Sequence, residues 1–162
     1  MLTVAQVTQD QVEELCAMLR EYLEWAFTLG DHIDAPTFSN VEDELRDLPG
    51  IFSPPLGRML VATYDGKLAG CIAINPHPNG VCELKRFYVK PEFRGKGIGS
   101  ALMKKFIEEA RSIGYRKAIL DSYYTMTDAH AAYRKVGFVD IEGPANFPPE
   151  LKPKVVFMEL DL

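Results

Sequence analysis

The segment Arg94-Gly95-Lys96-Gly97-Ile98-Gly99 constrains this chain most, because it separates a predicted strand (81–89) from a strong predicted helix (98–113). Apolar residues at three- and four-residue spacing predict that helix, and Gly114 closes it. Glycines let several backbone N–H groups point at one place, and a helix N-terminus adds unpaired donors and a positive dipole. The turn therefore predicts a phosphate or pyrophosphate site, with positive charge from Arg94 and Lys96 at its rim. The alternative is a turn of the same shape that binds no ligand.

The order of elements predicts the fold class. Strands are predicted over 2–7, 58–64, 67–74 and 81–89, and a tight turn at Asp65-Gly66 makes the middle pair a hairpin. Two helices, over 8–29 and 39–48, precede the hairpin. After the glycine turn and its helix come a strand (117–121), a helix from Thr127 or Asp128 to Val136, and strands over 138–141 and 155–160. A strand, a helix and a strand in this order form a parallel crossover. We expect one α/β domain over 1–162, on a mixed, mostly antiparallel sheet with a central parallel pair and flanking helices.

Composition excludes several classes of function. The 162 residues fit one domain, and a net charge of −5 argues against nucleic acid as a partner. No apolar run approaches the roughly 18 residues of a membrane span, and the N-terminus does not resemble a signal peptide. Cys16, Cys71 and Cys82 are odd in number and lack Cys-x-x-Cys spacing, so neither a disulfide framework nor a zinc site is indicated. We therefore expect a cytoplasmic protein without a metal or a membrane partner.

Three phosphate-binding motifs can be compared with the turn. The Walker loop needs Ser or Thr directly after Gly-Lys, but Gly97 follows Lys96. The dinucleotide motif Gly-x-Gly-x-x-Gly ends at Ser100 or Leu102 here, so it fails as well. Asp121 lies where a ribose-binding acid could follow, but the preceding hairpins do not suit a dinucleotide fold. The pattern that fits is Arg-x-x-Gly-x-Gly on Arg94, Gly97 and Gly99.

With that pattern in this place, the chain resembles the GCN5-related N-acetyltransferase (GNAT) superfamily. The resemblance runs over 83–89, 91–93, the glycine turn and 101–102, and resumes at Ala131-Ala132-Tyr133-Arg134-Lys135-Val136-Gly137-Phe138. The order of elements matches over nearly the whole length. The resemblance implies that backbone amides of the turn bind the pyrophosphate of coenzyme A (CoA), from Arg94, Gly95, Lys96, Gly97, Ile98, Gly99 and Ser100. It also implies a bulged strand that splays from its parallel neighbour, so that Phe87, Tyr88 and Val89 pair with the pantetheine arm.

The resemblance assigns two catalytic residues. Tyr133 matches the tyrosine that often acts as general acid toward the leaving thiolate, although it also lies on the apolar stripe of its helix. Glu83 stands where many relatives place a carboxylate that acts as base, directly or through water; the alternative is a strand-end acid that merely binds a cation or solvent. One departure is Met126, which replaces an Asn that relatives often carry near the cofactor arm.

The resulting functional hypothesis is transfer of acetyl from acetyl-CoA to a primary amine of a small-molecule acceptor, by direct attack. Alternatives are an acyltransferase of the same fold with a protein amine or another acyl-CoA, and a non-catalytic CoA-binding sensor. Expected pocket walls are 23–48, Pro54-Pro55, Tyr123-Tyr124 and the loop with Asn146 and Phe147. Arg86 could recognise an acceptor carboxylate, whereas His32, His77 and His130 are read as structural or surface residues. A homodimer is an expectation by analogy with relatives alone.

Overall fold

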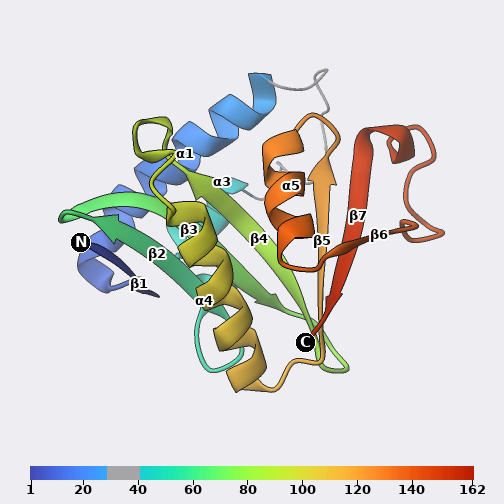
Figure 1. Cartoon of the computed structure of the whole chain (residues 1–162), viewed down its shortest axis with the longest axis horizontal. Helices are drawn as coiled ribbons and strands as arrows, with labels where there is room; N and C mark the ends of the chain where they lie inside the picture. The colour runs from blue at the N-terminus through green and yellow to red at the C-terminus, as the bar shows by residue number, and fades with distance from the viewer. Residues whose placement is uncertain (29–40) are drawn as a thin grey trace.

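In the part of the chain that the structure describes, seven strands form one sheet in the order β1-β2-β3-β4-β5-β7-β6 (Figure 1). The structure is a computed structural model that describes residues 1–28 and 41–162. Its strands are β1 (Leu2–Gln6), β2 (Arg58–Tyr64), β3 (Lys67–Pro76), β4 (Val81–Val89), β5 (Lys117–Tyr123), β6 (Val139–Ile141) and β7 (Val155–Asp161). Strands β4 and β5 pair in parallel, and the other neighbours pair antiparallel. The predicted α/β fold with a mixed sheet and a central parallel pair is confirmed.

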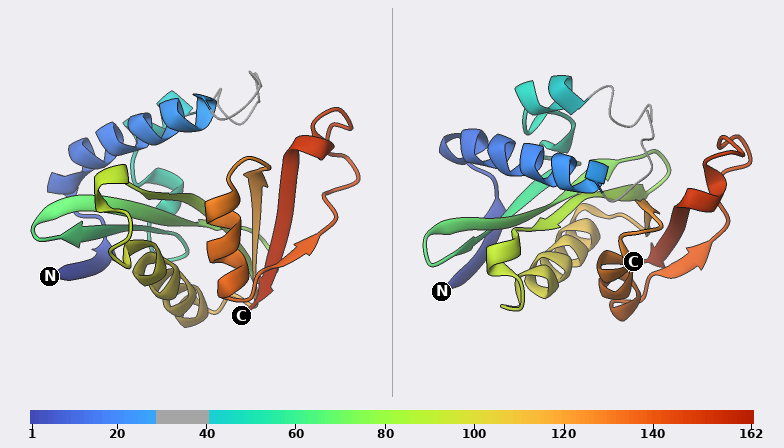
Figure 2. Two further views of the ribbon diagram at one scale, coloured as in Figure 1. Left: turned by 45° about the horizontal axis from the view of Figure 1, so that its top comes forward. Right: turned by 90° about the horizontal axis from the view of Figure 1, so that it is seen from above.

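Helices cover both faces of this sheet. Helices α1 (Val12–Thr28) and α3 (Val41–Arg46) lie on one face, and α4 (Ile98–Ile113) and α5 (Thr127–Lys135) on the other (Figure 2). Each face has its own buried cluster: Leu15, Leu19 and Leu45 pack on the first face, and Leu102 and Phe106 on the second. No helix among the described residues is both long and apolar enough to cross a membrane. The predicted helix ends at Leu29-Gly30 and Ser39, and His32, lie outside the described residues.

Local signals placed most elements correctly. Strands β2 and β4 and helix α4 have the predicted bounds, and Gly114 ends α4 in the left-handed conformation (φ 109°). The expected cap of α5 by Thr127 or Asp128 is wrong. Thr127 is already helical, and the N-cap position belongs to Met126, whose N–H donates to the Tyr123 carbonyl at 3.0 Å. A tight turn at the end of β5 therefore starts this helix in place of a capping side chain.

Strand β4 carries a bulge at Arg86 and Phe87. Cys71 of β3 pairs with Tyr88, but Ala73 pairs with Lys85, so two residues of β4 face one residue of β3. Arg86, inside the bulge, has a left-handed backbone (φ 56°), which is unfavourable for a residue with a side chain. The Cys71 thiol donates to the Arg86 carbonyl at 3.1 Å. This bulge is the one that the resemblance implied.

Strands β4 and β5 separate soon after they meet. Their parallel pairing covers only Val81–Glu83 against Lys117–Ile119, although both strands continue. Figure 1 shows them converging near the β3–β4 turn and diverging toward the N-termini of α4 and α5. The edge of β4 beyond Glu83 that faces β5 therefore has no strand partner among the described residues.

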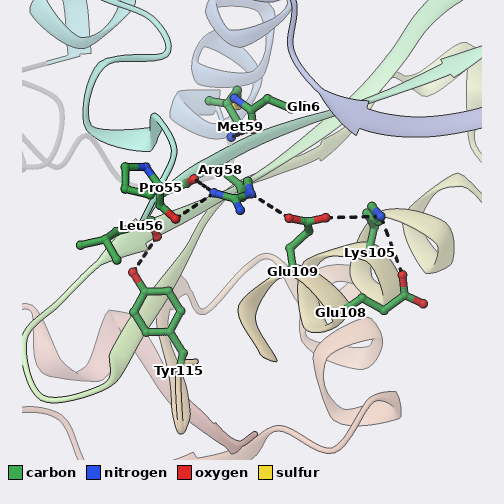
Figure 3. A network of polar contacts seen from close by, with 10 residues as sticks. Gln6, Pro55, Leu56, Arg58, Met59, Lys105, Glu108, Glu109 and Tyr115 are labelled. Carbon is green, nitrogen blue, oxygen red and sulfur yellow. Dashed lines mark hydrogen bonds and ion pairs between the residues drawn. The ribbon is translucent and has the colours of Figure 1, made fainter. Parts of the chain in front are cut away.

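The loop over 50–57 is tied to α4 and does not line the cavity where β4 and β5 part (Figure 3). Arg58 donates from Nη1 to the carbonyls of Pro55 (3.1 Å) and Gly57 (2.7 Å), and from Nε to Glu109 Oε2 (2.7 Å). Tyr115 Oη donates to the Leu56 carbonyl at 2.6 Å. The expectation that Pro54-Pro55 forms a wall of the acceptor pocket is wrong, because this network holds the loop elsewhere.

Candidate active site

A cavity of about 640 Å³ opens where β4 and β5 part. Its lining comes from α1, β4, the glycine turn, the ends of β5 and β7, the start of α5 and the loop before β7. Predicted site residues in that lining are Phe87, Tyr88, Val89, Arg94, Gly95, Gly97, Ile98, Gly99, Ser100 and Tyr133. Glu83 and Lys96 are the two that are not. Of the expected walls, Tyr123 and Phe147 line the cavity, whereas Tyr124 and Asn146 do not.

The glycine turn presents free backbone donors to this cavity. Gly95 and Gly97 adopt left-handed conformations (φ 78° and 77°), and a Cβ added at either would meet no atom within 4 Å. The first N–H groups of a helix lack intrahelical partners, and in α4 the earliest backbone bond runs from Ala101 to the Gly97 carbonyl. N–H groups over 95–100 can therefore converge on an anion, and the empty space at Gly97 is where an oxygen-rich group would fit.

Positive charge at the turn is held by aromatic rings. Arg94 lies over the Trp25 ring (5.3 Å to its centroid) and the Tyr88 ring (5.9 Å), and its Nε donates to the Val89 carbonyl at 3.1 Å. Lys96 lies over Tyr64, at 5.4 Å, away from the cavity lining. Cation–π contacts of this kind fix the direction of a charged side chain. Arg94 therefore remains at the cavity rim, where it links α1 to β4.

Tyr133 reaches the cavity from α5 and is 6% exposed. Its ring packs against Phe87 (5.7 Å between centroids) and Phe138 (5.9 Å). Burial raises its pKa, and the nearby Tyr22 and Asp121 raise it further. The hydroxyl therefore stays protonated at neutral pH and is able to donate a hydrogen bond, while the ring packs against its aromatic neighbours.

Glu83 sits beside the cavity and is already engaged. Its Oε1 lies 2.9 Å from His77 Nε2 and accepts from Asn75 Nδ2 at 3.2 Å. The carboxylate is 14% exposed, and His77, at 38%, leads from it to solvent. The sequence indicates a structural or surface role for His77 and does not predict this contact with Glu83. The arrangement suits a carboxylate that passes a proton outward better than one that touches a substrate.

Asp121 is a carboxylate that stands in the sequence where a ribose-binding acid could follow, and it was not predicted as a catalytic residue. It lies on β5 and lines the cavity, where it is open to the cavity space yet surrounded by protein on several sides. Desolvation by these surroundings raises its pKa, as does Glu83, whereas Lys85 and Arg86 lower it. The alternation along β5, with Ala118 and Leu120 buried on the α4 side, is the signal that could have placed Asp121 on the α1 side.

Arg86 is occupied by a carboxylate of its own chain. Its Nε and Nη2 donate to Glu44 Oε2 (2.9 Å) and Oε1 (3.1 Å), and both side chains are largely buried, at 10% and 14% exposed. A paired, bidentate contact of this kind leaves Arg86 little freedom to bind a substrate. The expectation that Arg86 recognises an acceptor carboxylate is therefore not supported; it ties the β4 bulge to α3.

The remaining reactive side chains are structural. Burial raises the thiol pKa of Cys71 and Cys82 to about 12, so neither is a thiolate nucleophile at neutral pH. His130 is 4% exposed, its Nε2 lies 2.9 Å from Ser122 Oγ, and burial lowers its pKa. It joins α5 to β5 as a neutral imidazole. Within 1–28 and 41–162, no three His, Cys, Asp or Glu side chains are grouped to hold a metal.

Comparison with known proteins identifies this architecture. The model of the acetyltransferase (GNAT) family matches residues 16–138. The chain belongs to the GNAT family. An uncharacterised N-acetyltransferase of Schizosaccharomyces pombe is 35% identical to it over 164 residues, which cover 99% of this chain and 94% of the relative. The IAA acetyltransferase of Azospirillum brasilense is 35% identical over 156 residues, covering 95% and 92%.

Solved GNAT structures share the fold. The PaiA N-acetyltransferase of Thermoplasma acidophilum, determined in complex with coenzyme A, superimposes with a TM-score of 0.77 over 100% of this chain and 99% of that chain, at 20% identity. This likeness shows the shared fold. The family match and the relatives show that the chain is an N-acetyltransferase of the GNAT family.

Proposed function

We propose that this GNAT protein transfers the acetyl group of acetyl-CoA directly to a primary amine of a small molecule. One observation carries the proposal: three features line the same cavity. They are the backbone N–H groups of the glycine turn, the β4 edge that has no strand partner among the described residues, and a carboxylate (Asp121) together with a phenol (Tyr133). A purely CoA-binding sensor would need the first two features, but it would have no use for Asp121 and Tyr133 at the same opening.

The residues present fit the proposed donor. The N–H groups of 95–100 would hold the pyrophosphate, with Arg94 at its side and open space at Gly97. The β4 edge over Phe87–Val89 would pair with the pantetheine arm, because no strand of residues 1–28 and 41–162 covers that edge. Lys96 would act through its backbone N–H alone. Bound acetyl-CoA supplies a thioester carbonyl that an amine can attack.

Proton handling follows from where the two carboxylates lie. Asp121 faces the cavity, so it would bind the acceptor ammonium and take its proton, freeing the lone pair that forms the C–N bond. Glu83 lies on β4 and pairs with Ile119, two residues before Asp121 on β5. Beside burial, its charge raises the pKa of Asp121, and with His77 it offers the proton a route to solvent. We therefore assign Glu83 the role of relay, which is the indirect form of the base predicted for it.

Tyr133 would act on the leaving group. As the C–S bond breaks, its hydroxyl donates a hydrogen bond to the sulfur. Its raised pKa makes full proton transfer to a thiolate, whose conjugate thiol has a pKa near 8.5, unfavourable. Tyr133 would therefore lower the barrier by hydrogen bonding in the transition state, and the released thiolate takes its proton from solvent.

The test measures donor binding and turnover together. Calorimetry should detect acetyl-CoA binding, and thiol release in the presence of a panel of primary amines should exceed the rate without amine. Gly97→Ala should weaken acetyl-CoA binding by about tenfold or more, because a methyl group would occupy the phosphate space. Gly66→Ala is the matched control, since Gly66 (φ 80°) carries the same backbone strain in the β2–β3 turn. Donor binding without thiol release from any amine would favour the sensor.

A further inference from the structure

Two side chains of opposite charge flank the opening between β4 and β5. Leu84 and Leu120 are buried on the α4 side of the sheet, so Lys85 and Asp121, their neighbours along each strand, belong to the α1 side. The last parallel pair is Glu83 with Ile119, and two further residues along each strand would bring Lys85 beside Asp121. Because the strands part there, both side chains instead line the cavity.

Neither charge forms an ion pair or a side-chain hydrogen bond within the described residues. No carboxylate oxygen of the described residues lies within 4.0 Å of Lys85 Nζ, and the Asp121 carboxylate accepts no hydrogen bond from another described side chain. They do not pair with each other either. Arg86, the residue next to Lys85, is by contrast fully engaged with Glu44. Lys85 is partly buried and Asp121 is exposed toward the cavity, and a partly desolvated charge without a partner is costly, so both are available to a ligand that enters the cavity.

Aromatic and aliphatic side chains form part of the same cavity wall. Tyr22 of α1, Tyr123 at the end of β5, and Phe147 and Leu151 of the loop before β7 line the same cavity. Burial raises the pKa of Tyr22, and Asp121 adds a smaller further rise, so the Tyr22 hydroxyl stays neutral beside these charges. Low-polarity walls strengthen any charge–charge contact made between them.

We propose that the acceptor is an amine that also carries a carboxylate, that is, a free amino acid, with Lys85 binding the carboxylate and Asp121 the ammonium group. The inference rests on the proposed function and names its substrate class. An amino acid satisfies both charges at once. A simple amine would leave Lys85 unpaired, and a diamine would bring a second cation toward it, so both are selected against.

The experiment compares matched acceptors. The standard amino acids, each beside the amine formed by its decarboxylation, are assayed for thiol release from acetyl-CoA. For the best amino acid, kcat/KM should exceed that of its decarboxylated partner by about tenfold or more, the value of one charge-assisted contact. Lys85→Met should bring this ratio close to one, mainly by raising the acceptor KM, whereas Lys85→Arg should keep the preference.

Controls separate recognition from folding. Lys104 is an exposed lysine on α4 outside the cavity, so Lys104→Met removes the same charge and should leave the ratio unchanged. Thermal unfolding and the acetyl-CoA Kd should match wild type in every variant. Should Lys85→Met fail these checks, Lys85→Gln, which keeps a polar end, replaces it.

The outcomes are distinct. Equal or faster turnover of the decarboxylated amines by wild type, or an unchanged ratio in a folded Lys85→Met protein, overturns the amino-acid acceptor while the proposed function stands. If the protein binds acetyl-CoA but acetylates neither the amino acid nor the amine of any pair, the proposal of a small-molecule acceptor fails, and this inference fails with it.

Discussion

Asp121 shows how one carboxylate is tuned by its neighbours. Burial and the charge of Glu83 raise its pKa above the ordinary 3.8, and Lys85 and Arg86 oppose the rise. A carboxylate with a higher pKa accepts a proton more readily, but it also becomes protonated, and so inactive as a base, at a higher pH as the solution is acidified. The acid limb of kcat/KM should therefore lie above pH 3.8, and Asp121→Asn should abolish that limb together with most of the activity.

Glu83 distinguishes the two carboxylates in the same pH profile. If Asp121 is the base, Glu83→Gln removes a negative neighbour and should move the acid limb to lower pH without abolishing it. Loss of the limb in Glu83→Gln and its retention in Asp121→Asn would instead make Glu83 the base. His77→Asn is the control for the contact that Glu83 makes at 2.9 Å.

Tyr133→Phe tests the hydrogen bond to the leaving sulfur. The ring contacts with Phe87 and Phe138 are retained, so folding and acetyl-CoA affinity should change little. We expect kcat to fall by about ten- to a hundredfold, since one donor aimed at developing charge is lost. The measurement is steady-state thiol release beside calorimetry; an unaltered kcat would leave Tyr133 with packing alone.

At the scale of elements, Arg58 and Glu109 join β2 and the 50–57 loop to α4 (Figure 3). Arg58, and to a lesser extent Lys105, lowers the pKa of Glu109. A lowered folded-state pKa contributes stability that is fully present above the unfolded value, about 4.3, and is lost as the pH falls through the folded value.

Glu109→Gln should therefore reduce the free energy of unfolding by about 1–2 kcal/mol at neutral pH, because the pair is about one-fifth exposed and partly screened by solvent. The difference from wild type should shrink as the pH falls below about 4. Urea unfolding at several pH values measures it, with Glu108→Gln, whose carboxylate is 53% exposed, as the control. A difference that does not depend on pH would argue against the ion pair as its cause.

The bulge in β4 shows what an element can hide from its sequence. Lys85-Arg86-Phe87 contains no glycine, so nothing local predicts a left-handed backbone at Arg86. The contacts that hold Arg86 in this conformation come from Glu44, 42 residues earlier, and from the Cys71 thiol of the neighbouring strand β3. Only the resemblance to GNAT proteins implied the bulge, and nothing in the sequence predicted where the Arg86 side chain points within it.

For the whole molecule, local chemistry predicted more than distant contacts did. The glycine turn, the helix that follows it and the hairpin at Asp65-Gly66 were readable because their signals lie within a few residues. Asp121 was missed as a cavity residue because its exposure depends on where β5 leaves β4, which is a property of the assembled sheet. Homodimer formation and a cytoplasmic location stay predictions, since both concern surroundings beyond one chain.

The three-residue contact between β4 and β5 divides the sheet into a four-stranded and a three-stranded half. Only three residue pairs join the two halves within the described sheet, so we expect the sheet to bend there as a hinge, at the place where chemistry is proposed. An acetyl-CoA arm laid along β4 would act as a missing strand and stiffen that hinge. Binding of acetyl-CoA would then stabilise the fold as well as supply the donor, and the enzyme without acetyl-CoA would be the less rigid of its two forms.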